Sequence, residues 1–186
     1  MTYLTRNETL SAWLREVDNL CQPDEVYWCD GSEEEYQRLM ALMIEGGSAT
    51  ALKKRSNSFL FRSDPSGVAR VEARTYISTP DEGEAGPTNN WIDPDELKKI
   101  MKELYSGCMK GRTLYIVPFS MGPIGSPMAK IGVELTDSPY VVCNMHMRRR
   151  GDAGTRGYNN AVMRIYGDEG KEGVFRLFSA SPRLIS

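Results

Sequence analysis

The segment from Gly111 to Pro127 restricts the fold of this chain more than any other part of it. Its first half, from Thr113 to Phe119, has the residues of a buried strand, and its second half contains two Gly, two Pro and two Ser. Glycine permits positive φ and close backbone approach, whereas proline fixes φ and removes an N–H. The loop has few possible paths, and such a loop directly after a strand is typical of a shaped surface.

Three helices are predicted before this segment, because apolar residues recur at steps of three and four. Asn7 or Thr9 can cap the first helix, and Asp93 followed by Pro94 begins the third. The second begins with a capping box, in which Ser32 accepts a first-turn N–H and Glu35 reaches back. The apolar faces are Leu10, Trp13, Leu14, Val17 and Leu20; Tyr36, Leu39, Met40 and Met43; and Leu97, Ile100, Met101 and Leu104.

Strands are predicted between and after these helices, from β-branched and aromatic residues bounded by turn residues. Residues 58–61 and 68–77 are expected to pair through a turn at 64–67, and a long acidic loop follows from 78 to 91. Further strands are expected at 25–29, 113–119, 129–135 and 139–145. Because helices and strands alternate, we predict an α/β fold with a mixed β-sheet flanked by helices.

Composition excludes several classes of protein. The chain is 40% hydrophobic and 26% charged, which is typical of a soluble globular protein, and its net charge of −2 gives no support for nucleic acid or an anionic membrane as partner. It has neither a signal segment nor an apolar run long enough to span a membrane, so we expect a cytoplasmic protein. The four cysteines lie far apart without a CxxC motif, which favours reduced, buried thiols.

Arg70 and Glu72 are candidate binding residues, because residues two apart on a strand project from the same face. Arginine can grip a carboxylate or phosphate through two parallel hydrogen bonds. An exposed strand face with alternating charge is nevertheless the more common explanation. Lys110 and Arg112 could likewise approach an anion, but basic residues near a helix end more often complement the helix dipole.

Metal and phosphate-loop chemistry have little support in the sequence. His146 is the only histidine, and on a strand Cys143 would lie on the opposite face from it, so no metal site is predicted. The segment from Gly167 to Gly173 lacks the glycine spacing and hydroxyl of a phosphate-binding loop and is interpreted as an acidic turn.

Six motifs together resemble the N-terminal domain of GTP-dependent phosphoenolpyruvate carboxykinase, and they occur in the same order as in that family. The strongest is the Gly111–Pro127 segment itself. The others are 29–35 (CDGSEEE), 64–72 (DPSGVARVE), 85–91 (AGPTNNW), 107–111 (GCMKG) and 132–140 (GVELTDSPY). The resemblance covers about residues 5 to 147, less than a third of the family's usual chain.

The resemblance implies a gluconeogenic lyase that converts oxaloacetate and GTP into phosphoenolpyruvate, CO₂ and GDP with manganese and magnesium ions. Arg70 corresponds to the arginine that binds a carboxylate of oxaloacetate or phosphoenolpyruvate. Glu72 lies on the same face, where it could hold that arginine or contact a mobile lid. A monomer is implied, and the nucleotide and metal sites of the family have no counterpart in this chain, so no catalytic, cofactor or metal residue is assigned.

Residues 1–147 are thus expected to form the substrate-side domain, and 148–186 a divergent basic tail, frameshifted or partly disordered. The tail carries a net charge of +4, which leaves −6 for the rest of the chain. We expect the chain to be inactive alone, with neither GTP nor a metal ion bound. The alternative is a noncatalytic paralogue that binds dicarboxylates or has a regulatory role.

Overall fold

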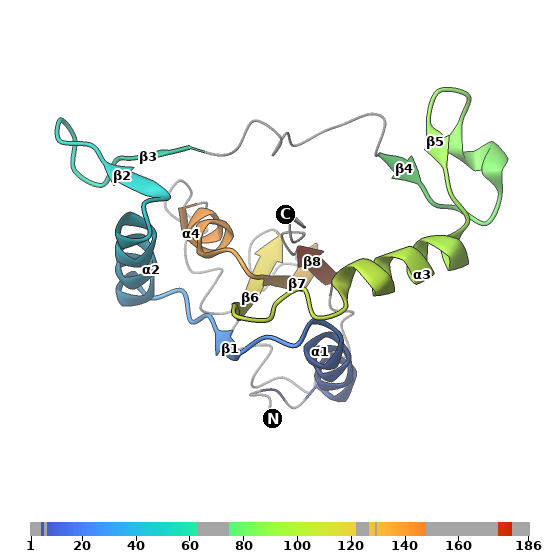
Figure 1. Ribbon diagram of the computed structural model, residues 1–186, viewed down its shortest axis with the longest axis horizontal. Coiled ribbons are helices and arrows are strands. Elements are labelled where there is room, and N and C mark those ends of the chain that lie inside the picture. Colours follow the sequence, from blue (N-terminus) through green and yellow to red (C-terminus); the bar gives the residue numbers. More distant parts are fainter. Residues whose placement is uncertain are drawn as a thin grey trace.

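A mixed β-sheet between helices forms the centre of the molecule, which confirms the predicted α/β class (Figure 1). The computed structural model describes residues 5, 7–62, 75–121, 127–128, 130–147 and 175–179. Among these residues no helix has the length and apolar character needed to cross a membrane.

The central sheet has the strand order β1-β6-β7-β8 in the described part of the chain. β1 (Glu25–Trp28) runs parallel to β6 (Thr113–Met121), and β6 runs antiparallel to β7 (Lys130–Thr136). β7 in turn runs parallel to β8 (Phe175–Ser179). The apolar half of the Gly111–Pro127 segment therefore provides an inner strand, as its residues predicted.

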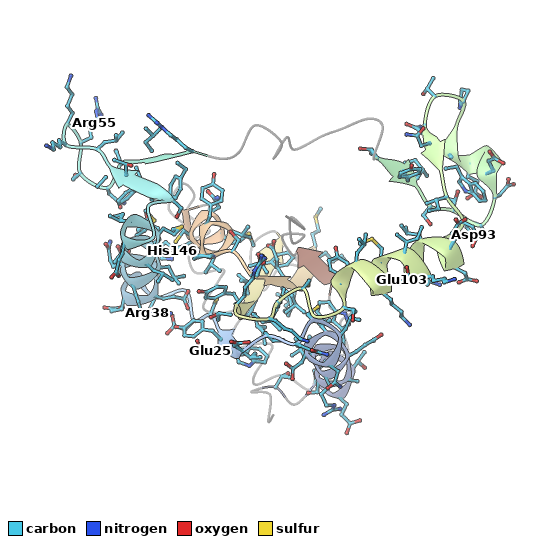
Figure 2. All side chains as sticks on the ribbon, in the orientation of Figure 1. Glu25, Arg38, Arg55, Asp93, Glu103 and His146 are labelled. Atoms are coloured by element: carbon cyan, nitrogen blue, oxygen red, sulfur yellow. The ribbon has the colours of Figure 1, made fainter. Side chains whose placement is uncertain are left out.

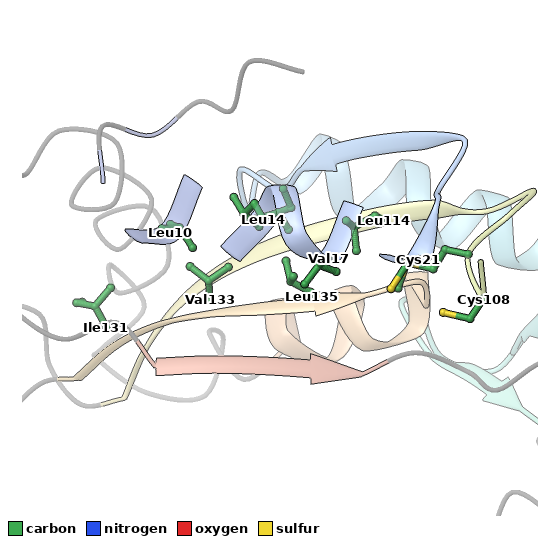
Figure 3. Packing of buried hydrophobic residues seen from close by; sticks show 11 residues of the cluster. Leu10, Leu14, Val17, Cys21, Cys108, Leu114, Ile131, Val133 and Leu135 are labelled. Atoms are coloured by element: carbon green, nitrogen blue, oxygen red, sulfur yellow. The ribbon is translucent and has the colours of Figure 1, made fainter. Parts of the chain in front are cut away.

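One face of the sheet is covered by α1 (Glu8–Cys21). The helix begins where the Asn7 side chain accepts a hydrogen bond from the Leu10 N–H at 2.9 Å, and it ends at Gln22, whose φ is 53°. Side chains from α1, β6 and β7 form the first hydrophobic cluster (Figure 3): Leu10, Leu14, Val17, Cys21, Leu114, Ile116, Ile131, Val133 and Leu135, with Cys108 and Met109.

The opposite face is covered by α2 (Glu33–Glu45) and α4 (Pro139–Met147). Ser32 caps α2 as predicted, since its hydroxyl accepts a hydrogen bond from the Glu35 N–H at 3.0 Å. Alternate residues of β6 point to this side and form the second hydrophobic cluster with the helices: Cys29, Tyr36, Leu39, Met40, Met43, Ala49, Tyr115, Val117, Val142 and Cys143.

The predicted strand at 139–145 is wrong, because these residues form α4. Pro139 opens the helix, where its missing N–H removes no helical hydrogen bond. The Ser138 carbonyl accepts hydrogen bonds from the N–H groups of Val141 and Val142 at 3.1 and 3.3 Å. A short buried apolar run has no periodicity that separates helix from strand.

Two smaller units lie at opposite ends of the molecule in Figure 1. One is a hairpin of β2 (Ala49–Ala51) and β3 (Phe59–Phe61). The other, the outer unit, covers residues 75–105 and contains β4 (Tyr76–Ile77), a 3₁₀ turn η2 (Glu82–Ala85), β5 (Asn90–Trp91) and α3 (Pro94–Tyr105). Residues 68–74, most of the strand predicted to pair with 58–61, lie outside the described residues, so that pairing stays a prediction. Among the described residues β3 pairs with β2, and β4 with β5.

Candidate functional site

Arg70 and Glu72, the residues predicted to bind substrate, lie outside the described residues. The structure does describe both ends of the segment that carries them, at Arg62 and at Thr75. These ends belong to different small units, the β2–β3 hairpin and the outer unit. The contacts that hold these two ends therefore define the structural surroundings of the candidate site.

The N-terminal end is anchored on the body of the molecule through β3. Phe59 and Phe61 are partly buried against the second hydrophobic cluster. The Phe61 ring meets the Tyr140 ring of α4 edge to face, with 4.7 Å between the ring centroids. Such aromatic pairs add about 0.5–1.5 kcal/mol beyond the burial of their surface. The chain thus leaves a packed position just before the candidate segment begins.

The C-terminal end is held by hydrogen bonds rather than by apolar packing. The Asn90 side chain donates to the Thr75 carbonyl at 3.1 Å, and Tyr76 pairs with Asn90 in the β4–β5 ladder. The Trp91 indole N–H donates to the Thr79 carbonyl at 2.9 Å. Tyr76 itself is exposed. This end of the segment is ordered locally, without a hydrophobic core beneath it.

Arg112, one of the two basic residues considered beside the central strand, has a structural partner. Its guanidinium forms a salt bridge with Asp137, whose side chain is only 3% exposed. The pair joins the start of β6 to the residue after β7 and neutralises a buried carboxylate. Removing one partner of such a pair leaves a buried charge without compensation.

Glu35 is a buried carboxylate with a defined structural task. It accepts hydrogen bonds from the N–H groups of Asp30 and Gly31 at 2.8 and 3.2 Å. Burial raises the pKa of Glu35, while these two hydrogen bonds act in the opposite direction. The Ser32 half of the predicted capping box is present. Glu35 reaches back beyond Ser32 to hold the turn between β1 and α2, and the Ser32 N–H donates to the Asp30 side chain instead.

His146 stacks on Tyr36, with the ring centroids 4.7 Å apart, and its Nε2 lies 3.6 Å from a carboxylate oxygen of Glu33 (Figure 2). The expectation that Cys143 and His146 face opposite ways is wrong, because on a helix residues three apart share a face. Both side chains are buried. The described residues contain no group of three or more His, Cys, Asp or Glu that could hold a metal ion.

A shallow hollow on α1 is lined by that helix alone, by Glu8, Thr9, Ala12, Trp13 and Glu16, so it contains two carboxylates. Two carboxylates would repel a dicarboxylate such as oxaloacetate. This hollow therefore does not fit the predicted substrate. Among the described residues, the contacts that hold the two ends of the 63–74 segment are therefore the structural information on the predicted site.

This chain belongs to the phosphoenolpyruvate carboxykinase N-terminal domain family, whose model matches residues 12–166. It is 59% identical over 160 residues to phosphoenolpyruvate carboxykinase (GTP) of Treponema pallidum strain Nichols, covering 86% of this chain and 25% of the relative. The enzymes of the same name from Corynebacterium jeikeium and Chlamydia pneumoniae are 51% identical over 148 residues and 49% identical over 169 residues. These matches cover 78% and 89% of this chain, and 24% and 27% of the relatives.

The comparisons also define how far the similarity extends. The chain spans about a quarter of the length of the curated relatives it matches. The family match continues to residue 166, beyond the residue 147 at which the motif resemblance was expected to end. A structural boundary at Met147 stays a prediction, because 148–174 and 180–186 lie outside the described residues.

Proposed function

We propose that this chain is the substrate-side domain of a GTP-dependent phosphoenolpyruvate carboxykinase, in which Arg70 binds a carboxylate of oxaloacetate or phosphoenolpyruvate. The observation that supports this most strongly is the family match across 12–166, which includes Arg70 and Glu72. Within that match the identity to a GTP-dependent relative reaches 59%. The resemblance of the motif around Arg70 supplies the residue's role.

The chemistry of the proposed reaction suits an arginine at this position. Loss of CO₂ from oxaloacetate leaves an enolate, and a guanidinium is protonated at every physiological pH. A fixed cation beside the developing charge lowers the barrier because it needs little reorganisation during the reaction. Glu72, two residues along, would hold the Arg70 guanidinium by a second ion pair or contact a lid.

The phosphoryl donor and the metal ions would be bound elsewhere in the complete enzyme. GTP would supply the phosphoryl group, and divalent manganese and magnesium would stabilise charge on the phosphates. The described residues do not fit a metal site, since no group of three or more ligating side chains occurs among them. We therefore propose that the chain alone does not convert oxaloacetate. Substrate binding and catalysis would then be separable properties.

A turnover assay tests the second half of this proposal. The purified 186-residue chain is incubated with oxaloacetate, GTP and Mn²⁺, and phosphoenolpyruvate is measured beside a full-length relative as positive control. No phosphoenolpyruvate above the spontaneous background is expected from the chain. Turnover by the chain alone would contradict the proposed inactivity.

Titration calorimetry with oxalate, a planar dicarboxylate that resembles the enolate, tests the first half. Arg70→Ala is expected to weaken binding by about tenfold or more, since hydrogen bonds to charged groups contribute roughly 1.5–3 kcal/mol. Arg70→Lys keeps the charge but loses the two-pronged geometry, so an intermediate affinity is expected. Arg55→Ala, at the exposed hairpin tip labelled in Figure 2, controls for non-specific anion binding.

The calorimetric result also addresses the alternative, a noncatalytic paralogue that retains dicarboxylate binding. Binding without turnover fits both proposals, and absence of heat in the unmodified chain would refute Arg70 as a binding residue in either.

We further propose a cytoplasmic, monomeric protein that acts in gluconeogenesis; sedimentation analysis would test the monomer.

A further inference from the structure

Cys21 and Cys108 lie against each other although they are far apart in the sequence. Cys21 is the last residue of α1, and Cys108 follows α3 in the turn that leads to β6. Both side chains belong to the first hydrophobic cluster, and their thiols share a side-chain hydrogen bond. Figure 3 shows the sulfur of Cys108 directed back toward Cys21. Two thiols in contact are the starting geometry of a disulfide.

The backbone on both sides of the pair holds this geometry in place. The Gly107 N–H donates to the Leu20 carbonyl at 2.7 Å, and the Met109 N–H donates to the Cys21 carbonyl at 2.9 Å. These two hydrogen bonds fix the end of α1 beside the 107–109 turn. A disulfide requires close Cα atoms and convergent side chains, and the thiol contact together with these two hydrogen bonds favours both.

We propose that Cys21 and Cys108 are a reversible oxidation site, which closes to an intramolecular disulfide when the chain meets a low-molecular-weight disulfide such as glutathione disulfide. Cys29 and Cys143 belong to the second hydrophobic cluster, on the opposite face of the sheet. In the reduced chain all four cysteines are free and buried, as the spacing of the cysteines predicted.

The exchange proceeds in two balanced steps. Cys108, a residue that is 4% exposed against 0% for Cys21, loses its thiol proton to solvent, and its thiolate attacks one sulfur of glutathione disulfide. One glutathione thiolate leaves, and a mixed disulfide remains on Cys108. The Cys21 thiolate then attacks the Cys108 sulfur and expels the second glutathione. The two cysteines lose two protons and two electrons, and the oxidant takes them up as two thiols.

The environment of the pair sets the rate of this exchange. Burial, and then the neighbouring Cys108 thiol, raise the pKa of Cys21 to about 12. At neutral pH the thiolate is therefore scarce, and exchange requires a local opening of the 107–109 turn. The dithiol is the resting state, and the disulfide forms slowly under sustained oxidation. Once formed, it fastens the C-terminal end of α1 to the turn before β6.

Oxidation followed by peptide mapping tests the proposal. The folded 186-residue chain is incubated with glutathione disulfide, remaining thiols are alkylated, and the intact mass and tryptic peptides are measured. We expect two of the four thiols to be lost without a glutathione adduct, and peptide 16–38 to be linked to peptide 103–110. Because peptide 16–38 also contains Cys29, the same link in Cys29→Ala assigns the bond to Cys21. Dithiothreitol should restore all four thiols.

Two variants and a stability measurement complete the test. The link should disappear in Cys108→Ala and in Cys21→Ala, with circular dichroism to verify that each variant is folded. The oxidised chain should unfold at a higher urea concentration than the reduced chain, since a cross-link restricts the unfolded state. Four alkylated thiols after oxidation of the folded chain, a persistent glutathione adduct on Cys108, or a link to Cys29 would each overturn the proposal.

Discussion

The body of the molecule and the outer unit are stabilised in different ways. The body consists of the central sheet with α1, α2 and α4, and it buries two hydrophobic clusters. In the outer unit, residues 75–105, Ala85 is the one buried residue among those that the structure describes. Hydrogen bonds such as that from Trp91 to the Thr79 carbonyl hold this unit together. It should therefore open at lower free energy than the body.

This difference matters for the candidate substrate-binding segment, because that segment connects the β3 end, which packs on the body, to the outer unit. It follows Phe61, which packs on the body, and it precedes Thr75, which is exposed and hydrogen-bonded to Asn90. Loops and segments that bind ligands are commonly drawn from the less stable part of a protein. In the proposed function, the substrate would bind at Arg70, on the segment that joins these two regions of different stability.

The largest expected effect comes from truncating one leucine in each region. Leu14 is fully buried in the first hydrophobic cluster, whereas Leu104 of α3 is 63% exposed. Leu14→Ala should lower the free energy of unfolding by about 2–5 kcal/mol, because it removes apolar contacts and leaves a cavity. Leu104→Ala should change it by less than about 0.5 kcal/mol. Urea denaturation followed by circular dichroism measures both.

Equal effects of the two leucine variants would contradict the comparison. A loss of about 2 kcal/mol in Leu104→Ala would mean that the α3 face is covered in solution. Leu104→Lys further distinguishes an exposed α3 face from a covered one. If the face is exposed, this variant should be as stable as the unmodified chain.

A steric test of the body comes next in size. Gly132 on β7 pairs with Phe119 on β6, and a Cβ added at Gly132 would clash with the Phe119 ring. Gly132→Ala should therefore cost about 1–3 kcal/mol, measured by thermal unfolding, because the ring or the strand must move. In a chain that already carries Phe119→Leu, Gly132→Ala should cost less stability than it does in the unmodified chain. Equal alanine costs in both backgrounds would show that the ring is not the obstacle.

The buried thiols predict a decline of stability in alkaline solution. Burial raises the pKa of Cys21 and of Cys143 from 9.0 to about 12. Between these values the unfolded chain has lost protons that the folded chain retains, so the free energy of unfolding falls as pH rises above about 9. Below pH 9 the contribution of the two thiols to the free energy of unfolding is fully present. Each thiol contributes a slope of at most about 1.4 kcal/mol per pH unit.

Urea unfolding between about pH 8 and 11 measures how the free energy of unfolding falls with pH. The unmodified chain is compared with a double variant that carries Cys21→Ala and Cys143→Ala. The double variant should show the shallower decline. Tyr105 and Tyr115, whose pKa values are also raised by burial, remain in both proteins and cancel in the comparison. Parallel slopes would mean that the thiols are accessible in the folded state.

Much of the body could be predicted from the sequence, because the signals there are local. Asn7 and Ser32 cap the two helices that were expected in the body, as Asp93 caps the third in the outer unit. Alternate residues of β6 point to the two faces of the sheet. The run Tyr140-Val141-Val142 was misassigned, because a helix buried on a sheet and a buried strand are both apolar over so few residues.

Long-range relations were predicted less well than local structure. The pairing of β3 with β2 depends on which strands meet in three dimensions, which local propensity does not specify. Amphipathic spacing predicted the apolar face of α3, but the spacing cannot say what covers that face. The site residues Arg70 and Glu72 were found by strand alternation and family resemblance. Because they lie outside the described residues, their placement stays a prediction.

The smallest expected effect comes from removing one helix cap in each region. The Ser32 hydroxyl accepts from the Glu35 N–H at the start of α2, in the body. Asp93 accepts from the N–H groups of Asp95 and Glu96, at 2.8 and 3.2 Å, at the start of α3 in the outer unit. Loss of such a cap typically costs about 1 kcal/mol. Ser32→Ala should therefore lower the global free energy of unfolding by about that amount.

Asp93→Ala should weaken α3 to a similar extent, but its cost should remain local, since no residue of that helix is buried. Amide hydrogen exchange in α3 should accelerate about fivefold, which corresponds to about 1 kcal/mol, while the urea midpoint of the body stays unchanged. Asp93→Asn and Ser32→Thr keep a capping oxygen and should restore most of the loss. If Asp93→Ala moved the global midpoint as far as Ser32→Ala, the outer unit would unfold together with the body, and the order at Thr75 would derive from the central sheet.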